Sequence, residues 1–366
     1  MVKRLFLLNG LAIIAVVLNH AAGWGFTAMF WWTDRYLPVA VPNWDQAGTF
    51  TYSVLAGIKH LSAFAVPSFL FVSGFFVAYA FKGSQQLSMW RIVRVRLSSL
   101  LIPYVIWSFA IFIGDALMGT RYSLGEYLVR LLYSGAAPPF YYVPVLSVCL
   151  LLSPLLLPIA KRHGNLLIAL SALAPMILEA SEYLRGFGVT IGDLANSPAY
   201  QLSFRWLVFF LIGIVCGFRI ESLSRWLARL RGVLFSALIL LVPLSLVGTE
   251  LLPYKTDVLS QPDFVPVISN IYACVFILSF LAVRTTPIPF SNALYRLGSK
   301  SYGIYLLHFE SMTLVAKFVY HFTPWILAWQ VLYQPILFFS GLVLVVWMME
   351  ALVKTPAKRF SRILFG

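Results

Sequence analysis

Long apolar runs separated by short polar segments extend from one end of the chain to the other. A helix needs about 20 mostly apolar residues to cross the hydrocarbon core of a membrane, and this requirement selects about ten stretches. Transmembrane helices are expected over residues 5–22, 53–80, 98–118, 141–160, 165–183, 203–220, 232–249, 264–283, 299–320 and 327–352. No repeat or linker divides them. The pattern predicts an all-α polytopic membrane protein, with these helices in a single bundle that forms one membrane-embedded domain over residues 1–366.

Two features predict where the regular spans are interrupted or joined. The second run contains Pro67, which is expected to kink the helix without breaking it, because neighbouring helices can satisfy the freed carbonyl group. Two polar connections, YSLGEYLVRLLYS and ESLSRWLARLRG, place leucines and aromatic residues on one helical face and charges on the other. Each is expected to be a helix on the membrane surface or an ordinary connecting helix.

Composition and charge exclude several classes of protein. Hydrophobic residues make up 60% of the chain and charged residues only 11%, against about 25% in soluble domains. The net charge of +14 does not indicate nucleic-acid binding, because most of the 27 Lys and Arg residues follow the spans in alternate connections. This bias predicts that both termini are cytoplasmic. The 3 cysteines lie in apolar runs without paired spacing, so neither a disulfide nor a structural metal site is expected.

The most informative polar residue is His20, at the end of the first apolar run, LFLLNGLAIIAVVLNH. A titratable side chain is costly in hydrocarbon, so an intramembrane histidine marks a candidate functional site. Its ordinary pKa near neutrality suits an imidazole to accept and return a proton. A polar helix end lying among lipid headgroups is the alternative explanation for this residue alone.

Further polar residues are expected near the same membrane level as His20. They include two histidines, His60 in the second span and His308 in the ninth, and two carboxylates, Glu179 and Glu310. A buried carboxylate is costly unless it is paired or protonated, so these residues together predict an aqueous cavity that opens outward. The connection after the first span contains several tryptophans, beginning with Trp24. These predict either a surface for sugar rings or the usual aromatic belt of a membrane interface.

Basic residues define a second level on the cytoplasmic side. Arg4 precedes the first span, and Arg91 and Arg94 are spaced so that both guanidinium groups can hold one phosphate at the start of the third. Basic residues are also expected at any cytoplasmic helix start. From Asn9 to His20 the rise along a helix axis is about 16 Å, close to the reach of a phosphopantetheine arm. An acyl group could therefore cross the membrane while its nucleotide carrier stays inside.

Five motifs occur in a fixed order along nearly the whole chain. They are GLAIIAVVLNH, FLFVSGFFVAY, WRIVRVRLSSLLIPYVIW, YYVPVLSVCLLLSPLL and LGSKSYGIYLLH. With these motifs the chain resembles the integral membrane acyltransferase family 3, the bacterial O-acyltransferases of surface sugars. The resemblance implies a ten-span core that transfers acyl groups, usually acetyl from acetyl-CoA, to hydroxyl groups. It places the family's functional positions on His20, Arg91, Arg94, Ser73 and His308.

One position departs from the family pattern. The arginine that usually lies eleven residues before the catalytic histidine is replaced by Asn9. Donor contacts are then expected to pass to Arg4 or Lys3, or the donor itself differs, so its identity is left open. Tyr142, in the fourth motif, is a candidate substrate-binding residue together with the outer histidines and Trp24.

The sequence therefore predicts a multi-pass acyltransferase of the bacterial inner membrane, in which His20 is the general base. Glu310 or Glu179 would orient it, and Arg4, Arg91 and Arg94 would bind an acyl-CoA, most simply acetyl-CoA. The acceptor would be a hydroxyl of a cell-envelope or exported glycan, and other envelope-glycan biosynthesis proteins are candidate partners. Two alternatives are an exporter of a glycan or lipid-linked sugar, and an inactive scaffold in a glycan-modifying complex.

Overall fold

The structure is a computed structural model that describes residues 2–83, 89–134, 136–186, 198–256, 267–283 and 288–366. Every regular element in these ranges is helical, which confirms the all-α fold for this part of the chain. The α-helices are α1 (Val2–Phe26), α2 (Phe50–Leu61), α3 (Ala65–Gly83), α4 (Met89–Leu117), α5 (Leu124–Val129), α6 (Tyr142–Gly186), α7 (Pro198–Phe218), α8 (Ile220–Arg229), α9 (Arg231–Thr256), α10 (Val267–Ala282), α11 (Ser291–Ser299), α12 (Ser301–Phe322), α13 (Gln330–Phe338), α14 (Val345–Val353) and α15 (Ser361–Phe365).

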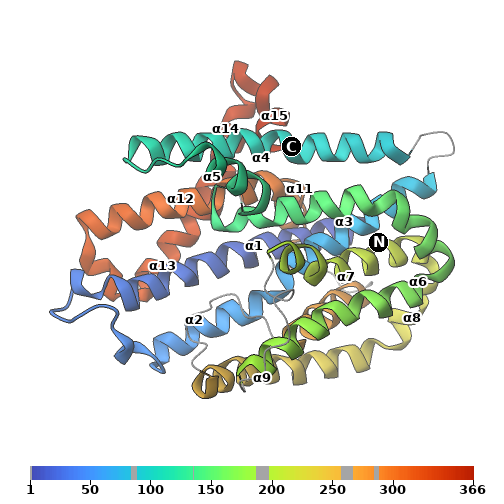
Figure 1. Cartoon of the computed structure of the whole chain (residues 1–366), viewed down its shortest axis with the longest axis horizontal. Helices are drawn as coiled ribbons and strands as arrows, with labels where there is room; N and C mark the ends of the chain where they lie inside the picture. Colours follow the sequence, from blue (N-terminus) through green and yellow to red (C-terminus); the bar gives the residue numbers. More distant parts are fainter. Residues whose placement is uncertain (1, 84–88, 135, 187–197, 257–266, 284–287) are drawn as a thin grey trace.

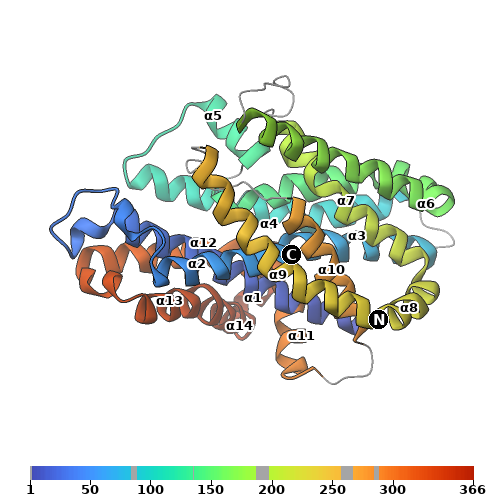
Figure 2. The same ribbon diagram turned by 90° about the horizontal axis from the view of Figure 1, so that it is seen from below.

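Most of the long helices lie side by side along the long axis of the molecule, and α1 runs through the middle of the bundle (Figures 1 and 2). It packs against α2, α3, α11, α12 and α13. Its position follows from its composition, because an almost uniformly apolar helix can be covered on all sides. Polar side chains in the apolar part of α1, such as Asn9 and His20, are therefore held among neighbouring helices.

Several helices in the described part of the chain are long and apolar enough to span a membrane, but they are fewer than the ten spans that the sequence predicts. In the described residues, 5 helical segments are long and apolar enough to cross a membrane, or up to 6 if the bent pair of α7 and α8 is one span. The protein is therefore a helical membrane protein. The prediction of ten spans is not confirmed, and the cytoplasmic location of both termini stays a prediction.

The interruptions follow the local sequence. A short 3-10 turn, Ser62–Phe64, separates α2 from α3 just before Pro67, while the apolar path continues from Phe50 to Lys82 as one span. In α6 the backbone leaves helical geometry at His163, and the chain turns back there (Figure 1). Residues 138–177 nevertheless count as one membrane-length segment, so the separate spans 141–160 and 165–183 stay a prediction.

Both predicted connecting helices are present. The first is α5, which continues as a π-helix over Arg130–Ser134. The backbone N–H of Ser123 donates to the Glu126 carboxylate at 2.7 Å, and this bond holds the pKa of Glu126 below its ordinary value. The second is α8, bent by 103° from α7. Both short helices therefore form where the amphipathic patterns predict them, and their location on a lipid surface stays a prediction.

Glycine allows two helix pairs to touch through their backbones. In α3, a Cβ atom at Gly74 would overlap the carbonyl oxygen of Phe210 in α7. In α1 and α11, Cβ atoms at Gly10 and Gly298 would overlap the carbonyl oxygens of Leu294 and Phe6. Such close approach needs residues without side chains. The glycines in three of the five sequence motifs therefore have a packing role.

Candidate functional site

Two histidines from distant parts of the sequence meet between α1 and α12. The ring centroids of His20 and His308 are 5.2 Å apart, and the ring planes are inclined by 48°. His308 is completely buried, whereas His20 is half-buried. Phe309 lies edge-on against His20 with the centroids 5.3 Å apart. The fold thus pairs two imidazoles in a largely apolar setting, and one of them keeps some access to the outside of the protein.

The backbone of α12 determines which nitrogen of His308 carries a proton. His308 Nδ1 lies 2.7 Å from the carbonyl oxygen of Tyr305 and 3.2 Å from that of Ile304. Because a carbonyl oxygen accepts, Nδ1 must donate, and Nε2 of the neutral ring is left with a free electron pair. Nε2 is buried and has no hydrogen-bond partner among the described residues. It is available to accept a proton from a neighbouring or bound group.

Aromatic side chains extend this pair into a larger group. Trp24 lies 6.2 Å from Phe309 and 5.3 Å from Trp32, between ring centroids. The indole N–H of Trp24 is buried and has no hydrogen-bond partner in the described parts of the chain. We refer to His20, Trp24, His308 and Phe309 as the histidine cluster. It offers a partly exposed imidazole, a free imidazole acceptor and an unused indole donor.

Two more of the predicted binding residues adjoin the histidine cluster without joining it. Tyr142 is buried, with its ring 5.4 Å from that of Tyr305, which in turn lies 5.9 Å from the His308 ring. His60 is in the last turn of α2, beside Lys59, and Lys59 acts electrostatically on both His60 and His20. These residues therefore border the cluster from two sides.

The predicted carboxylates are not part of the described cluster. Glu310 is two residues after His308, and helical rotation places it on the opposite side of α12. Its charged neighbours are Asp115 of α4 and Lys317. The side chain of Glu179 lies outside the described residues. In the described chain, no three His, Cys, Asp or Glu side chains come together as metal ligands.

The basic residues singled out from the sequence are separated from one another. Arg91 and Arg94 are exposed on the first turns of α4, whereas Arg4 is half-buried on α1. Arg96, to which the sequence assigned no separate role, turns inward and donates to the carbonyl oxygen of Phe76 at 3.2 Å. The guanidinium groups at the start of α4 are accessible to a soluble anion, but no pocket is described around them.

Ser73 and Asn9 lie at two different places in the core. Ser73, on α3, is within hydrogen-bonding range of the hydroxyl group of Tyr142, the first residue of α6. The side-chain oxygen of Asn9 is buried and has no hydrogen-bond partner among the described residues. Asn9 and His20 are three helical turns apart and share one face of α1.

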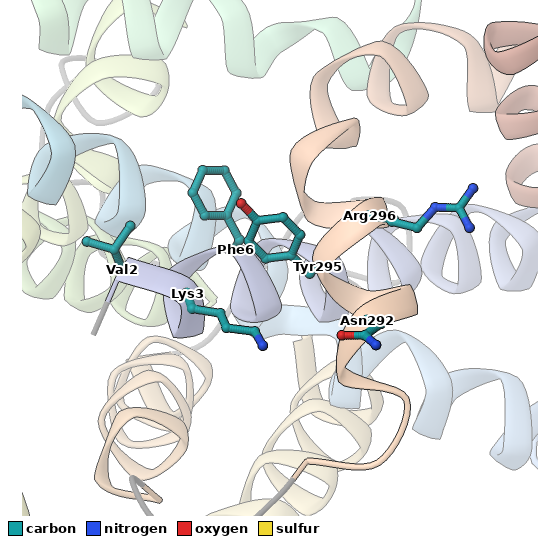
Figure 3. A pocket seen from close by; sticks show the side chains of 6 residues that line it. All are labelled: Val2, Lys3, Phe6, Asn292, Tyr295 and Arg296. Atoms are coloured by element: carbon teal, nitrogen blue, oxygen red, sulfur yellow. The ribbon is translucent and has the colours of Figure 1, made fainter.

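A cavity between α1 and α11 was not expected from the sequence. Its volume is about 540 Å³. It lies at the first turns of α1, toward the end opposite to the histidine cluster, because Lys3 and Phe6 line it (Figure 3). We call it the α1–α11 pocket, and it is lined by Val2, Lys3, Phe6, Asn292, Tyr295 and Arg296. The helical spacing of Asn292, Tyr295 and Arg296 was the only signal for this face. Nothing in the sequence indicated that it meets α1.

A second cavity of about 560 Å³ lies between the C-terminal end of α11, helix α14 and helix α15. Glu350 of the second cavity binds Arg296, which lines the α1–α11 pocket, at 2.7 Å, and it also binds the ammonium group of Lys300. Lys354 and Arg362 line the second cavity. The region around α11 is therefore rich in cations, and one carboxylate compensates two of them.

Comparisons with known proteins support one assignment. No curated protein and no solved structure matches the chain significantly. A family model described as an acyltransferase domain matches residues 3–350, a range that contains the histidine cluster and every lining residue of the α1–α11 pocket except Val2. The protein, a helical membrane protein, therefore belongs to acyltransferase family 3.

Proposed function

We propose that the protein is an O-acyltransferase of the bacterial inner membrane. In this proposal it transfers an acyl group, most simply acetyl, from cytoplasmic acyl-CoA to a hydroxyl of a cell-envelope or exported glycan. Family membership supports acyl transfer. The single structural observation that carries the proposal is the pairing of a partly exposed imidazole, His20, with a buried imidazole whose Nε2 is free to accept.

The proposed reaction uses His20 as the general base. His20 removes the proton from the acceptor hydroxyl while the hydroxyl oxygen attacks the thioester carbonyl carbon. The new carbon–oxygen bond forms, the carbon–sulfur bond breaks, and the departing CoA thiolate takes the proton back from His20. Positioned acid–base catalysis of this kind contributes about 10²–10⁴-fold to a rate. Nε2 of His308 accepts a hydrogen bond from His20 or from the acceptor hydroxyl during this transfer.

The layout of α1 supports donor and acceptor sites on opposite membrane surfaces. Lys3 and Arg4 begin the helix, and His20 is near its far end, about 24 Å from Arg4 along the axis. The distribution of basic residues favours a cytoplasmic location for the first end. Trp24 and Trp32 border the histidine cluster at the second end, and aromatic rings of this type suit sugar faces.

An exporter without acyl transfer is the competing function. It would explain polar residues inside the bundle, but it does not require a fixed tautomer at His308 or a half-buried imidazole beside it. Family membership also favours chemistry over transport. The two functions differ in one measurable property, which is whether the purified protein consumes an acyl donor.

The test is release of free thiol from acetyl-CoA by the purified full-length protein in nanodiscs, with a pooled extract of envelope glycans as acceptor. We expect His20→Ala to lose at least about a hundredfold in kcat, because the base is removed. His321→Ala is the matched control, since His321 is an exposed histidine at the end of α12. Retained activity in His20→Ala, with folding shown by size-exclusion profile, contradicts the proposed role. Absence of donor consumption by the wild type favours export.

A further inference from the structure

The α1–α11 pocket combines groups that suit one class of ligand. Each helix contributes one face: Lys3 and Phe6 come from α1, and Asn292, Tyr295 and Arg296 come from α11 (Figure 3). Together they provide two cations, one amide and an aromatic pair. This set matches a phosphorylated nucleoside, because cations bind the phosphates while an amide and aromatic rings bind the base.

The aromatic wall is formed by Phe6 and Tyr295. Their ring centroids are 5.1 Å apart, with the planes inclined by 53°. Tyr295 is 38% exposed, so part of its ring surface is not covered by Phe6 or by other residues. A purine can stack on such a ring, and base–aromatic stacking contributes about 1–3 kcal/mol per base.

The charged wall combines Lys3 with the first and last turns of α11. Lys3 is exposed, and the side chain of Arg296 is 69% exposed even though it binds Glu350. The N-cap residue of α11 is Phe290, whose own side chain makes no capping hydrogen bond. Asn292 lies in that turn, where helix N–H groups and the helix dipole favour anions. A phosphate in the pocket would therefore meet Lys3 and this turn, whereas the guanidinium group of Arg296 points away from Lys3 (Figure 3) and binds Glu350.

The two walls are held in register by the backbone contacts described above. Gly10 and Gly298 bring α1 and α11 together directly at Leu294 and Phe6, and Phe6 is itself a lining residue. Because backbone contact leaves no side chain to rearrange at the junction, the relative position of Phe6 and Tyr295 is constrained. The pocket is a preformed feature of this helix pair.

A second observation extends the site along α1 toward the histidine cluster. Asn9 follows Phe6 by three residues, and its buried side-chain oxygen has no hydrogen-bond partner in the described residues. A pantetheine arm carries two amide N–H groups that could donate to this oxygen. From Asn9 the remaining rise to His20 is about 16 Å. Ile13 and Val16 are buried on this face, so the acyl end reaches His20 only in a conformation that uncovers them.

We infer that the α1–α11 pocket binds the phosphorylated adenosine end of the acyl-CoA donor, and that Asn9 accepts a hydrogen bond from the pantetheine arm. This inference rests on the proposed acyltransferase function. The inference places the nucleotide at the α1–α11 pocket instead of at Arg91 and Arg94. It also assigns a binding function to Asn9, which stands where the family pattern has an arginine. The cavity volume of about 540 Å³ accommodates a nucleotide.

The test measures binding of two probes, adenosine 3′,5′-bisphosphate and CoA, by calorimetry with the full-length protein in nanodiscs of neutral lipid. Tyr295→Ala and Lys3→Gln are each expected to weaken both probes by about tenfold. Tyr295→Phe keeps the ring and is expected to bind both like the wild type. Asn9→Leu replaces the side-chain amide, including its acceptor oxygen, by an apolar group of similar size, so it is expected to weaken CoA and to leave the bisphosphate unchanged.

Two control variants test the location of the site. Lys354→Gln removes a cation from the second cavity, and Arg91→Gln with Arg94→Gln removes the exposed pair on α4. Both are expected to bind the bisphosphate normally. If one of these control variants loses bisphosphate binding while Lys3→Gln and Tyr295→Ala retain it, the inference about the pocket is overturned. The acyltransferase proposal is unaffected by that result. If the wild type binds neither probe and consumes no acyl-CoA, both are overturned.

The phosphate of a lipid headgroup is the alternative ligand that could occupy the α1–α11 pocket. Native mass spectrometry of protein purified from membranes containing phosphatidylglycerol distinguishes the two sources. If Lys3→Gln and Tyr295→Ala reduce the amount of retained phosphatidylglycerol but do not alter bisphosphate binding, the pocket is a lipid site and the inference is wrong. If bisphosphate displaces no lipid and binding falls only in the pocket variants, the inference is supported.

Discussion

The histidine cluster and the α1–α11 pocket lie toward opposite ends of the same helix and differ in almost every physical respect. In the histidine cluster the polar groups are buried or half-buried among aromatic rings, and two ring nitrogens have no partner among the described residues. In the pocket the cations are exposed, and Glu350 already compensates Arg296. Proton transfer benefits from fixed groups in a dry site, whereas capture of a charged soluble molecule needs accessible charge. One helix provides both environments.

Substitutions at His308 are expected to have the largest effect and to act on the histidine cluster alone. Asparagine at this position can still donate to the Tyr305 carbonyl oxygen but has no group at the position of Nε2, whereas glutamine can place an acceptor near it. We expect His308→Asn to lower kcat by about a hundredfold, with the KM for acyl-CoA unchanged, and His308→Gln to retain more activity. Steady-state kinetics of the folded variants measures this difference. Equal loss in both variants would indicate a purely structural role for His308.

A substitution at the junction of α1 and α11 should act on the other region. In Gly10→Ala the new Cβ would overlap the Leu294 carbonyl oxygen, so the helices must separate. We expect a loss of stability of about 1–3 kcal/mol and a higher KM for acyl-CoA, because the pocket walls move apart. Gly57→Ala in α2 is the matched control, since a Cβ there meets nothing within 4 Å. Thermal unfolding and donor kinetics of both variants provide the measurement. Unchanged donor KM in a destabilised Gly10→Ala would separate packing from donor binding.

Ionic strength provides the mildest perturbation. Salt screens exposed charges over about 10 Å at 0.1 M and buried groups much less. We therefore expect the KM for acyl-CoA to rise severalfold between low and high salt while kcat stays nearly constant. In Lys3→Gln the dependence of KM on salt should become weaker. If kcat falls with salt and KM does not, the contrast between an exposed binding region and a buried chemical region is wrong.

The sequence pointed to the residues of the histidine cluster more directly than to those of the α1–α11 pocket, for a physical reason. An intramembrane histidine is conspicuous in an apolar run, so His20 and His308 could each be selected without knowing the tertiary structure. Their contact required packing of α1 against α12, which no local pattern specifies. Gly74 belongs to one of the five sequence motifs, but its close contact with the backbone of Phe210 is visible only in the folded structure.

Residues outside the apolar runs were harder to assign. Tyr295 and Arg296 belong to a polar connection with no feature that distinguishes it from others, and they gain significance only because α11 packs on α1. Arg91 and Arg94 were conspicuous because of their spacing, yet both are exposed and no described pocket surrounds them. Glu310 was favoured for its nearness to His308 in sequence. Two residues along a helix correspond to opposite faces, which explains why it points toward Asp115 and Lys317.

The hydrogen bonds from Nδ1 of His308 to its own helix have a consequence for chemical labelling. An electrophile that reaches this ring encounters one reactive nitrogen, because the other is occupied by the carbonyl oxygens of Tyr305 and Ile304. Any adduct at His308 should therefore be a single regioisomer, substituted at Nε2. His20 has no such bond to its helix among the described contacts, so it is not restricted in this way. The regiochemistry of adducts is therefore expected to differ between these two neighbouring histidines.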